Sequence, residues 1–535
     1  MRKQLFSQTG TLASFIIRRD RIRLPIWLIS FLLITIVTAS AFTGLYSSEH
    51  ERQAIAETMR NPAMTAMVGV GYGLDNYTAG PMMAHQMLLF TAIVVAIMST
   101  LLVTRHTRAD EEDGRIELIR SLPVGRLSNV SATIIVMVSA NVLLALLIGF
   151  GLASLQIESI DLKGSLLYGA ALGATGIFFT AITALFAQLS ENSRGTIGFS
   201  FIVLGVAYLI RAVGDVSNET LSWFSPLGWI LKTEAYVNNV WWPIILTVGS
   251  AIIVGIITLF LNKIRDLESG FFPSKPGRKY ASRLLQSPFG LAFRLQRTGI
   301  VAWAIGMYVL GLSYGSVFGD LESFFSNNEM MTEMLSPVEG LSLTEQFLAI
   351  LMSVISMICT VPALMFMLKL KGEEKKERTD HLLSRAVSRM RVMGSYFIIS
   401  MFFGSMMLFL ALLGLWSAST AVMDEAISFS AMLEAGMVYL PAMWMMIGLA
   451  VLFIGLLPQF TGFSWLYLGY SFLVVYLGGL LQFPEWMRNL SPFGHVPQVP
   501  VEELNVSTVL MLTSLAAILV IIGFIGYRKR DIVGQ

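Results

Sequence analysis

Charged side chains at a fixed spacing recur in two segments of this sequence, and they are the residues best suited to binding a partner protein. Glu111 precedes Arg115 by four positions, and Glu374 precedes Arg378 in the same way, the order that favours ion pairs along a helix. We therefore predict a short charged helix in each segment, the first ending near Pro123 because proline stops a helix. A solvated loop is the alternative, but such a loop needs no carboxylates at a fixed spacing. We interpret both segments as docking sites.

No motif for nucleotide binding or catalysis accompanies these segments. The sequence has no Gly-x-x-x-x-Gly-Lys-Ser/Thr loop and no Gly-Lys dipeptide, so it lacks the P-loop that cradles nucleotide phosphates. Met82, Met83, His85 and Met87 lie close together and could suggest copper handling, but methionine more often packs adaptably among apolar side chains. Cys359 is the single cysteine. We expect neither an enzyme nor a metal site, and if ATP drives the protein, another chain binds it.

The elements that must position the charged segments are apolar runs long enough to cross a membrane. Hydrophobic residues make up 55% of the 535 positions and charged residues only 13%, whereas a soluble chain carries about 25% charged residues. Charge-free runs of about 18 residues or more fit helices through a hydrocarbon core of about 30 Å. The sequence predicts an all-α polytopic membrane protein with about twelve transmembrane helices. The spans are expected at 24–45, 87–104, 129–154, 164–188, 196–213, 239–262, 300–318, 346–368, 392–415, 435–457, 464–482 and 506–527.

The placement of charge predicts the orientation of these spans. With the N-terminus inside, the inner segments contain 31 of the 37 lysines and arginines, as the positive-inside rule requires. The spans themselves offer neutral polar groups such as Asn141 and Thr360, whereas ion-driven carriers usually keep a charged group near the midplane. We predict that both termini are cytoplasmic and that the energy for transport comes from outside the spans.

The chain resembles itself when it is shifted by 263 positions, because 108–126 then matches 371–389 with five identities in 19 positions. Other landmarks follow in the same order, including an Arg-Asp pair that closes each half. Apolar residues beside arginines before the first span of each half suit interfacial helices, with simple anchoring as the alternative. The sequence therefore predicts two parallel repeats of six spans. The expected parts are a first six-helix half at 1–262, a basic cytoplasmic linker with an interfacial helix at 263–299 and a second six-helix half at 300–535.

Several motifs, taken in order over essentially the whole chain, resemble the ABC-2 type of exporter permease. The resemblance is to the large duplicated permeases that export polyketide antibiotics and are related to tetronasin resistance. The motifs are Gly10-Thr11-Leu12 with Arg18-Arg19-Asp20-Arg21, Asn61-Pro62-Ala63-Met64, Glu111-Glu112-Asp113-Gly114-Arg115 with Ser121-Leu122-Pro123-Val124, and Arg530-Asp531.

The resemblance implies a permease in a bacterial plasma membrane, driven by two copies of a cytoplasmic ABC ATPase that bind ATP and magnesium. In such permeases the helix between the second and third spans couples to the ATPase. The coupling residues so implied are Glu111, Glu112, Arg115 and Glu117 in the first half and Glu374, Arg378 and Asp380 in the second. The second half departs from the pattern, which predicts unequal docking surfaces. The departures are Lys375-Lys376-Glu377 in place of Glu112-Asp113-Gly114 and Ala386 in place of Pro123.

Two other functions fit the sequence. An ion-coupled secondary multidrug carrier is one, because its Asp-x-x-Gly-Arg pattern is faintly imitated at 111–115. A membrane sensor or assembly factor without flux is the other, signalling through the same inner helices. For an exporter, spans rich in Met, Phe and Leu favour hydrophobic or amphiphilic compounds, such as antibiotics, as the substrate. Membrane lipid surrounds the chain in either case, and no nucleic-acid partner is expected.

Overall fold

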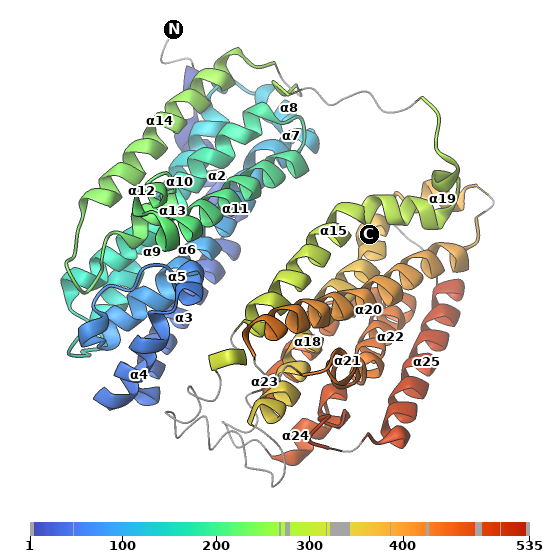
Figure 1. Cartoon of the computed structure of the whole chain (residues 1–535). Helices are drawn as coiled ribbons and strands as arrows, with labels where there is room; N and C mark the ends of the chain where they lie inside the picture. The colour runs from blue at the N-terminus through green and yellow to red at the C-terminus, as the bar shows by residue number, and fades with distance from the viewer. Residues whose placement is uncertain are drawn as a thin grey trace. The chain divides into compact units, whose positions relative to one another are not determined.

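The computed structural model describes residues 5–46, 48–266, 269–272, 279–316, 318–320, 343–385, 387–423, 427–476, 484–502 and 504–530. They belong to two compact units, Met1–Pro276 and Gly277–Gln535, and each unit is a bundle of long helices (Figure 1). In this described part every named element is a helix, and Ser190 and Phe272 form an isolated β-bridge. The boundary between the units falls within the segment that the sequence predicts as a linker.

Eleven helices in the described residues are long and apolar enough to cross a membrane, and each coincides with a predicted span. A helix satisfies its own backbone hydrogen bonds, which is why apolar runs adopt this form in a bilayer. The twelfth predicted span, 464–482, is described only as far as Tyr476, at the end of α23 (Phe463–Tyr476). The arrangement of twelve spans as two repeats of six therefore stays a prediction.

Helix α10 (Leu162–Leu189) lies at the centre of the first unit, packed against α6, α9, α11 and α14. Glycines allow its close approach to α9: a Cβ atom added at Gly169 would lie 2.2 Å from the carbonyl oxygen of Ala145. Small residues at such contacts let helix backbones pack tightly within a membrane. The other spanning helices of this unit are α3 (Arg23–Leu45), α6 (Ala79–Thr104), α9 (Ser128–Ala153), α11 (Ser193–Ser217) and α14 (Trp242–Ile264).

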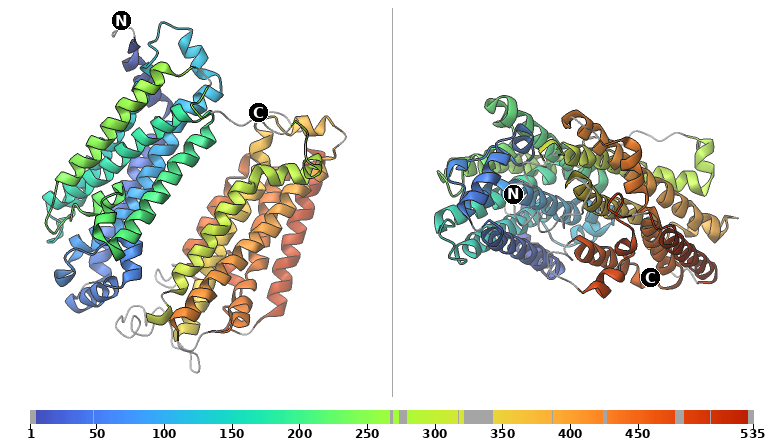
Figure 2. Two further views of the ribbon diagram at one scale, coloured as in Figure 1. Left: turned by 45° about the horizontal axis from the view of Figure 1, so that its top comes forward. Right: turned by 60° about the horizontal axis from the view of Figure 1, so that its bottom comes forward.

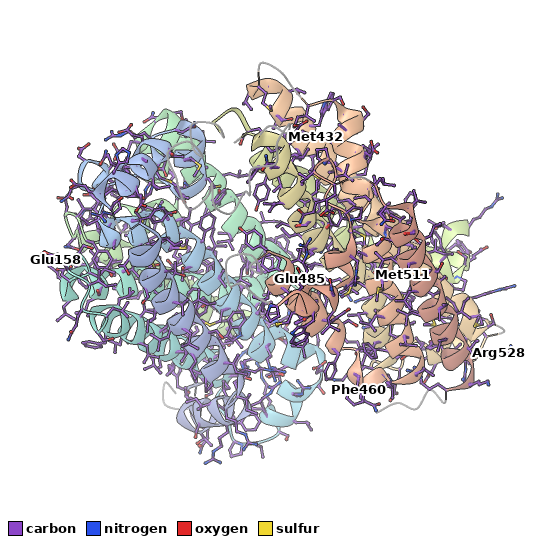
Figure 3. All side chains as sticks on the ribbon, turned by 90° about the horizontal axis from the view of Figure 1, so that it is seen from below. Glu158, Met432, Phe460, Glu485, Met511 and Arg528 are labelled. Atoms are coloured by element: carbon purple, nitrogen blue, oxygen red, sulfur yellow. The ribbon has the colours of Figure 1, made fainter. Side chains whose placement is uncertain are left out.

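The second unit has the same distribution of burial. Its second and fourth spans, which contain α18 (Leu343–Glu374) and α22 (Leu440–Leu456, after the short α21, Phe429–Met437), are the most buried, as α6 and α10 are in the first unit. Side chains fill the space between the helices within each unit (Figure 3). The remaining spanning helices are α15 (Pro288–Gly315), α20 (Arg389–Val422) and α25 (Val506–Lys529), and α20 packs against both of the others (Figure 2).

The charged segments lie at one end of each unit, which we name the basic end. Helices α7 (Asp110–Glu112) and α8 (Arg115–Arg120) mark it in the first unit, and α4 (Glu49–Met59) lies at the opposite end (Figure 1). In the second unit α19 (Asp380–Leu383) marks the basic end, opposite α24 (Glu485–Asn489).

The segments predicted as interfacial helices differ between the units. In the first unit α2 (Thr9–Arg19) is separate from α3, and its Leu12 and Ile16 are buried against Ala132 and Val136 of α9. In the second unit residues 288–299 are instead the first turns of α15, which runs on without a break into the span.

Candidate functional site

Each charged segment contains a break at a residue with a left-handed backbone. In the first unit α6 continues through a π-helical turn, Arg105–Ala109, into α7, and Gly114 then has a φ of +71° before α8 begins. In the second unit Glu377 has a φ of +57° between α18 and α19. A left-handed residue cannot continue a right-handed helix. The prediction of one short continuous helix in each segment is therefore wrong, and the geometry for ion pairs four residues apart is lost.

Glu111 lies in a buried ion pair rather than on the surface. Its side chain is 7% exposed, and Oε2 lies 2.8 Å from Nη2 of Arg265, the first residue after α14. The same oxygen lies 2.9 Å from Nη1 of Arg108. Arg108 in turn donates from Nε to the backbone carbonyl of Ser190, just beyond α10, over 2.7 Å. We name the Glu111–Arg265 pair the first clasp, because it joins the charged segment to the end of the last helix of its unit.

The second unit has an equivalent pair, Glu374–Arg530, which we name the second clasp. Oε2 of Glu374 lies 2.7 Å from Nη2 of Arg530, the first residue after α25, and the two side chains are 10% and 15% exposed. Lys371 takes the place of Arg108, since it donates to the hydroxyl of Thr461 over 2.6 Å and to the carbonyl of Pro458, just beyond α22. Two glutamates predicted to face an ATPase are thus largely buried within their own units.

The arginines of the predicted pairs bind other carboxylates. Nη1 of Arg115 lies 2.7 Å from Oδ1 of Asp110, and Nη1 of Arg378 lies 3.1 Å from Oε2 of Glu373. Each arginine therefore pairs with an acidic residue five positions back across the break, and this contact holds the turn closed in both units.

Each unit has an exposed acidic residue at the basic end, just after the break. Glu117 on α8 and Asp380 on α19 are exposed, and neither side-chain carboxylate has a hydrogen-bond or ion-pair partner among the residues that the structure describes. Glu112 is exposed too, but its carboxylate accepts hydrogen bonds from the backbone N–H and the hydroxyl of Ser193, over 2.8 and 2.7 Å. Leu118 is 72% exposed beside Glu117. Helix α8 therefore presents an exposed apolar side chain next to an exposed carboxylate.

The sequence of the chain matches a known family over both units. The family described as multidrug efflux system permease Rv1217c, C-terminal domain, matches residues 10–260 and 285–528. The chain belongs to this family. It is similar to the multidrug efflux system permease protein Rv1217c of Mycobacterium tuberculosis (strain ATCC 25618 / H37Rv), with 34% identity over 531 residues, which cover 98% of this chain and 95% of the relative. With eleven apolar helices in its described residues, this member of the Rv1217c permease family is a multi-pass membrane protein.

In this Rv1217c-family permease, the basic end of the first unit has ion pairs that the second unit lacks. Arg19 of α2 binds Asp110 with both Nη atoms, one of them at 2.8 Å, and these hydrogen bonds raise the pKa of Arg19 above its ordinary value. The ring of His106 binds the carboxylate of Asp20. At the matching positions of the second unit the sequence has Leu295 and Gln296, so α2 is the better-anchored of the two segments.

Sequence reasoning missed the residues that complete the clasps. Arg265 and Arg530 were visible only as a repeated Arg-Asp pair, to which no role was assigned. Asp20 lies among four arginines, and a single acidic residue in a basic segment indicates that its carboxylate has a specific ion-pair partner. No local sequence pattern identifies His106 as that partner, because the two residues are 86 positions apart.

The first unit also contains a charged pair inside a span, which the sequence analysis did not predict. Arg211 on α11 is fully buried, and its Nη1 lies 3.4 Å from Oδ2 of Asp215. Its two Nη atoms donate to the carbonyls of Thr65 and Met67 over 3.2 and 3.3 Å. These contacts tie α11 to α5 (Pro62–Val68), on the side of the unit away from the clasp. The spans are therefore not wholly uncharged.

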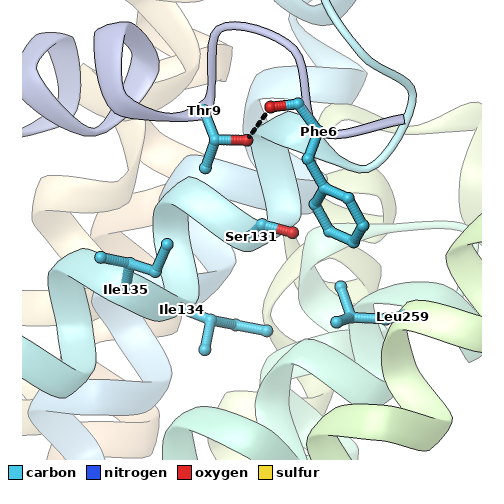
Figure 4. Close-up of a pocket in the computed structure, with 6 residues that line it drawn as sticks. All are labelled: Phe6, Thr9, Ser131, Ile134, Ile135 and Leu259. Atoms are coloured by element: carbon cyan, nitrogen blue, oxygen red, sulfur yellow. Dashed lines mark hydrogen bonds between the residues drawn. The ribbon is translucent and has the colours of Figure 1, made fainter. Parts of the chain in front are cut away.

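A groove of about 410 Å³ lies between the N-terminal segment, α9 and α14 of the first unit (Figure 4). Its walls are mainly apolar. The one polar atom of note is Oγ of Ser131, a buried atom without a hydrogen-bond partner in the described structure. The groove is open and apolar enough for a lipid chain, and it has no polar groups that would select a particular compound. The lining residues are Phe6, Thr9, Ser131, Ile134, Ile135 and Leu259.

Proposed function

We propose that the chain is the transmembrane permease of an ATP-driven exporter of hydrophobic or amphiphilic compounds, including antibiotics. ATP and magnesium bind to two copies of a separate cytoplasmic ATPase, one on each basic end, and both termini of the permease are cytoplasmic. The support from similarity is the 34% identity, over 98% of this chain, to a protein whose name describes a multidrug efflux permease. No P-loop occurs in the sequence, so the proposal needs a second chain to bind the nucleotide.

The observation that carries the proposal is the exposed surface of α8 and α19. Glu117 and Asp380 occupy equivalent positions, 263 residues apart, and both are exposed and unpaired in the described structure. A solvated loop does not require an acidic residue at the same place in both units. The two surfaces are unequal, because Leu118 accompanies Glu117 whereas His381 accompanies Asp380, and unequal docking of the two ATPase copies follows.

The test is co-purification of the ATPase with charge-reversed variants. We expect Glu117→Lys and Asp380→Lys each to lower the amount of ATPase recovered, by at least tenfold when both are combined, because reversing a charge on a docking surface removes its electrostatic complementarity to the partner. Glu158→Lys is the matched control, since Glu158 is exposed in a predicted outer loop. Recovery of no ATPase with the unaltered permease from native membranes would refute the proposal, as would full recovery with the double variant.

The buried Arg211–Asp215 pair favours a second candidate, the ion-coupled secondary carrier. Charged residues inside spans often mark ion pathways, and this pair lies within α11. Efflux that persists in ATP-depleted cells but stops when an uncoupler removes the proton gradient would support the carrier. The opposite pattern supports the ATP-driven exporter.

A further inference from the structure

The Arg-Asp pair that closes each half has no role in the proposed function so far. Docking requires exposed residues, but Arg265 and Arg530 have side chains that are only 6% and 15% exposed. The positive-inside rule does not explain them either, because exposed neighbours such as Lys263 and Lys529 already provide positive charge at these helix ends. Burial of a charge is costly unless the charge is paired, so the pairing partner of each arginine indicates its purpose.

Each closing arginine joins three helix ends of its unit. In the first unit the side chain of Arg265 binds Glu111, beyond the second span, while its backbone carbonyl accepts a hydrogen bond from Nη2 of Arg126 over 2.6 Å. Arg126 lies two residues before α9, the third span. The first clasp therefore connects the end of the second span, the start of the third and the end of the last.

The second unit repeats all of these contacts. The side chain of Arg530 binds Glu374, and its carbonyl accepts a hydrogen bond from Nη1 of Arg389, the first residue of α20. Nη1 of Arg530 also donates to the carbonyl of Ile454 in α22 over 2.6 Å. The same three-way junction thus occurs in both units, although the contacts that Arg19 and Asp20 make in the first unit have no counterpart at Leu295 and Gln296 in the second, which argues against chance.

The helices that end in the clasps are exposed on much of their surface, and each packs mainly against one neighbour in its unit, α14 against α10 and α25 against α22. α14 is the least buried of the eleven apolar helices, and α25 is among the least buried of its unit. Both expose large apolar side chains along their length, such as Ile252 and Ile256 in α14 and Ile518 and Ile521 in α25. The clasp at the end of each helix adds a second attachment, to the charged segment, beside the packing against that neighbour.

We propose that the clasps transmit the displacement of each charged segment to the last helix of the same unit. This rests on the proposed function, in which an ATPase docks on α8 and α19, and adds that the docked ATPase displaces them. Glu111, Arg265, Glu374 and Arg530 are then positioning residues for transport, acting through helix movement and not through contact with the substrate or the ATPase.

The second clasp gives the cleaner experiment, because Glu111 has Arg108 as an additional partner. The variants are Glu374→Gln, Arg530→Gln and the double variant, with Lys529→Gln as a control that removes an exposed neighbouring charge. ATP-dependent uptake of a fluorescent amphiphilic dye is measured in inside-out vesicles, beside the amount of ATPase that co-purifies. We expect each single variant to lower uptake at least tenfold with ATPase binding within twofold of the unaltered protein. The double variant should be no worse than Arg530→Gln alone, because Glu374 acts through Arg530, whereas Arg530→Gln also removes the hydrogen bond to the carbonyl of Ile454.

Three outcomes would overturn the proposal. They are normal uptake in both single variants, additive losses in the double variant, and a loss of ATPase binding in proportion to uptake, which would make the residues docking residues.

A second measurement works without an ATPase and separates failure of this inference from failure of the proposed function. Spin labels at His381→Cys on α19 and Arg528→Cys on α25 report the distance between the two elements, since both positions are exposed and Cys359 is buried and unlabelled. The distance distribution should broaden at least twofold in both Glu374→Gln and Arg530→Gln. An unchanged distribution would show that the clasp does not hold α19 to α25, whatever powers transport.

Discussion

The two left-handed breaks predict opposite effects of two substitutions at equivalent positions. Gly114 has a φ of +71°, and a Cβ atom added there would meet no atom within 4 Å, so Gly114→Ala tests backbone strain alone. The left-handed conformation costs a non-glycine residue about 1–2 kcal/mol. Alanine recovers about 0.4–1 kcal/mol by restricting the unfolded chain. The expected net loss in the free energy of unfolding is about 1 kcal/mol, by subtraction of these two values.

Glu377, at the matching position, already bears this cost at a φ of +57°. Glu377→Gly should therefore stabilise the protein by a similar amount, about 1 kcal/mol. For units of this size such a change shifts the melting temperature by about 2–4 °C, downward for Gly114→Ala and upward for Glu377→Gly. Tryptophan fluorescence of the purified protein in detergent, followed on heating, measures both shifts.

Gly205→Ala is the matched control for these variants. Gly205 lies within helix α11, and a Cβ atom there also meets nothing within 4 Å. Alanine is favoured over glycine inside a helix by about 0.5–1 kcal/mol, so this variant should melt slightly higher. If Gly114→Ala melts like the control, or if Glu377→Gly melts lower than the unaltered protein, the assignment of strain to these turns is refuted.

Two further predictions concern packing and burial in the first unit. Gly169→Ala places a methyl group 2.2 Å from the carbonyl oxygen of Ala145, so α9 and α10 must separate at a cost of about 1–3 kcal/mol or more; a melting temperature equal to that of Gly205→Ala would contradict the close contact. Arg211→Met leaves Asp215 charged and buried, at a cost of about 3–5 kcal/mol, and should release α5 from α11. Limited proteolysis between residues 46 and 78 should then become faster, and an unchanged rate would show that the pair does not hold this region.

The apolar spans could be predicted from the sequence, and the charged contacts between them could not. Eleven of the predicted spans meet a helix because hydrophobic length alone determines where a helix can cross a bilayer. The charged segments were found by their repeat, but their conformation was misjudged. The spacing of Glu374 and Arg378 suits a helix, and nothing in Lys375-Lys376-Glu377 signals a left-handed turn, although Gly114 at the matching position did.

Which carboxylates are buried depends on contacts that are remote along the chain. Glu111 and Arg265 are separated by 154 positions, and no local pattern at Glu111 distinguishes it from its neighbour Glu112, which stays exposed. Arg211 was overlooked for a related reason. A single arginine near the end of an apolar run looks like an anchor at the membrane surface, and only the position of Met67 reveals that its charge is enclosed.

The strained turn at Glu377 has a consequence for how the two halves can evolve. A permease assembled from two copies of one shorter chain carries every substitution twice. A strained backbone at the break would then destabilise both halves, and both halves would lose a contact such as Asp20–His106. A single polypeptide that contains both halves carries each substitution in one half only. Here Gly114 and Glu377 stand at the matching breaks, so a substitution at one break leaves the other unchanged. The two basic ends can therefore acquire different docking surfaces by substitutions within this one chain.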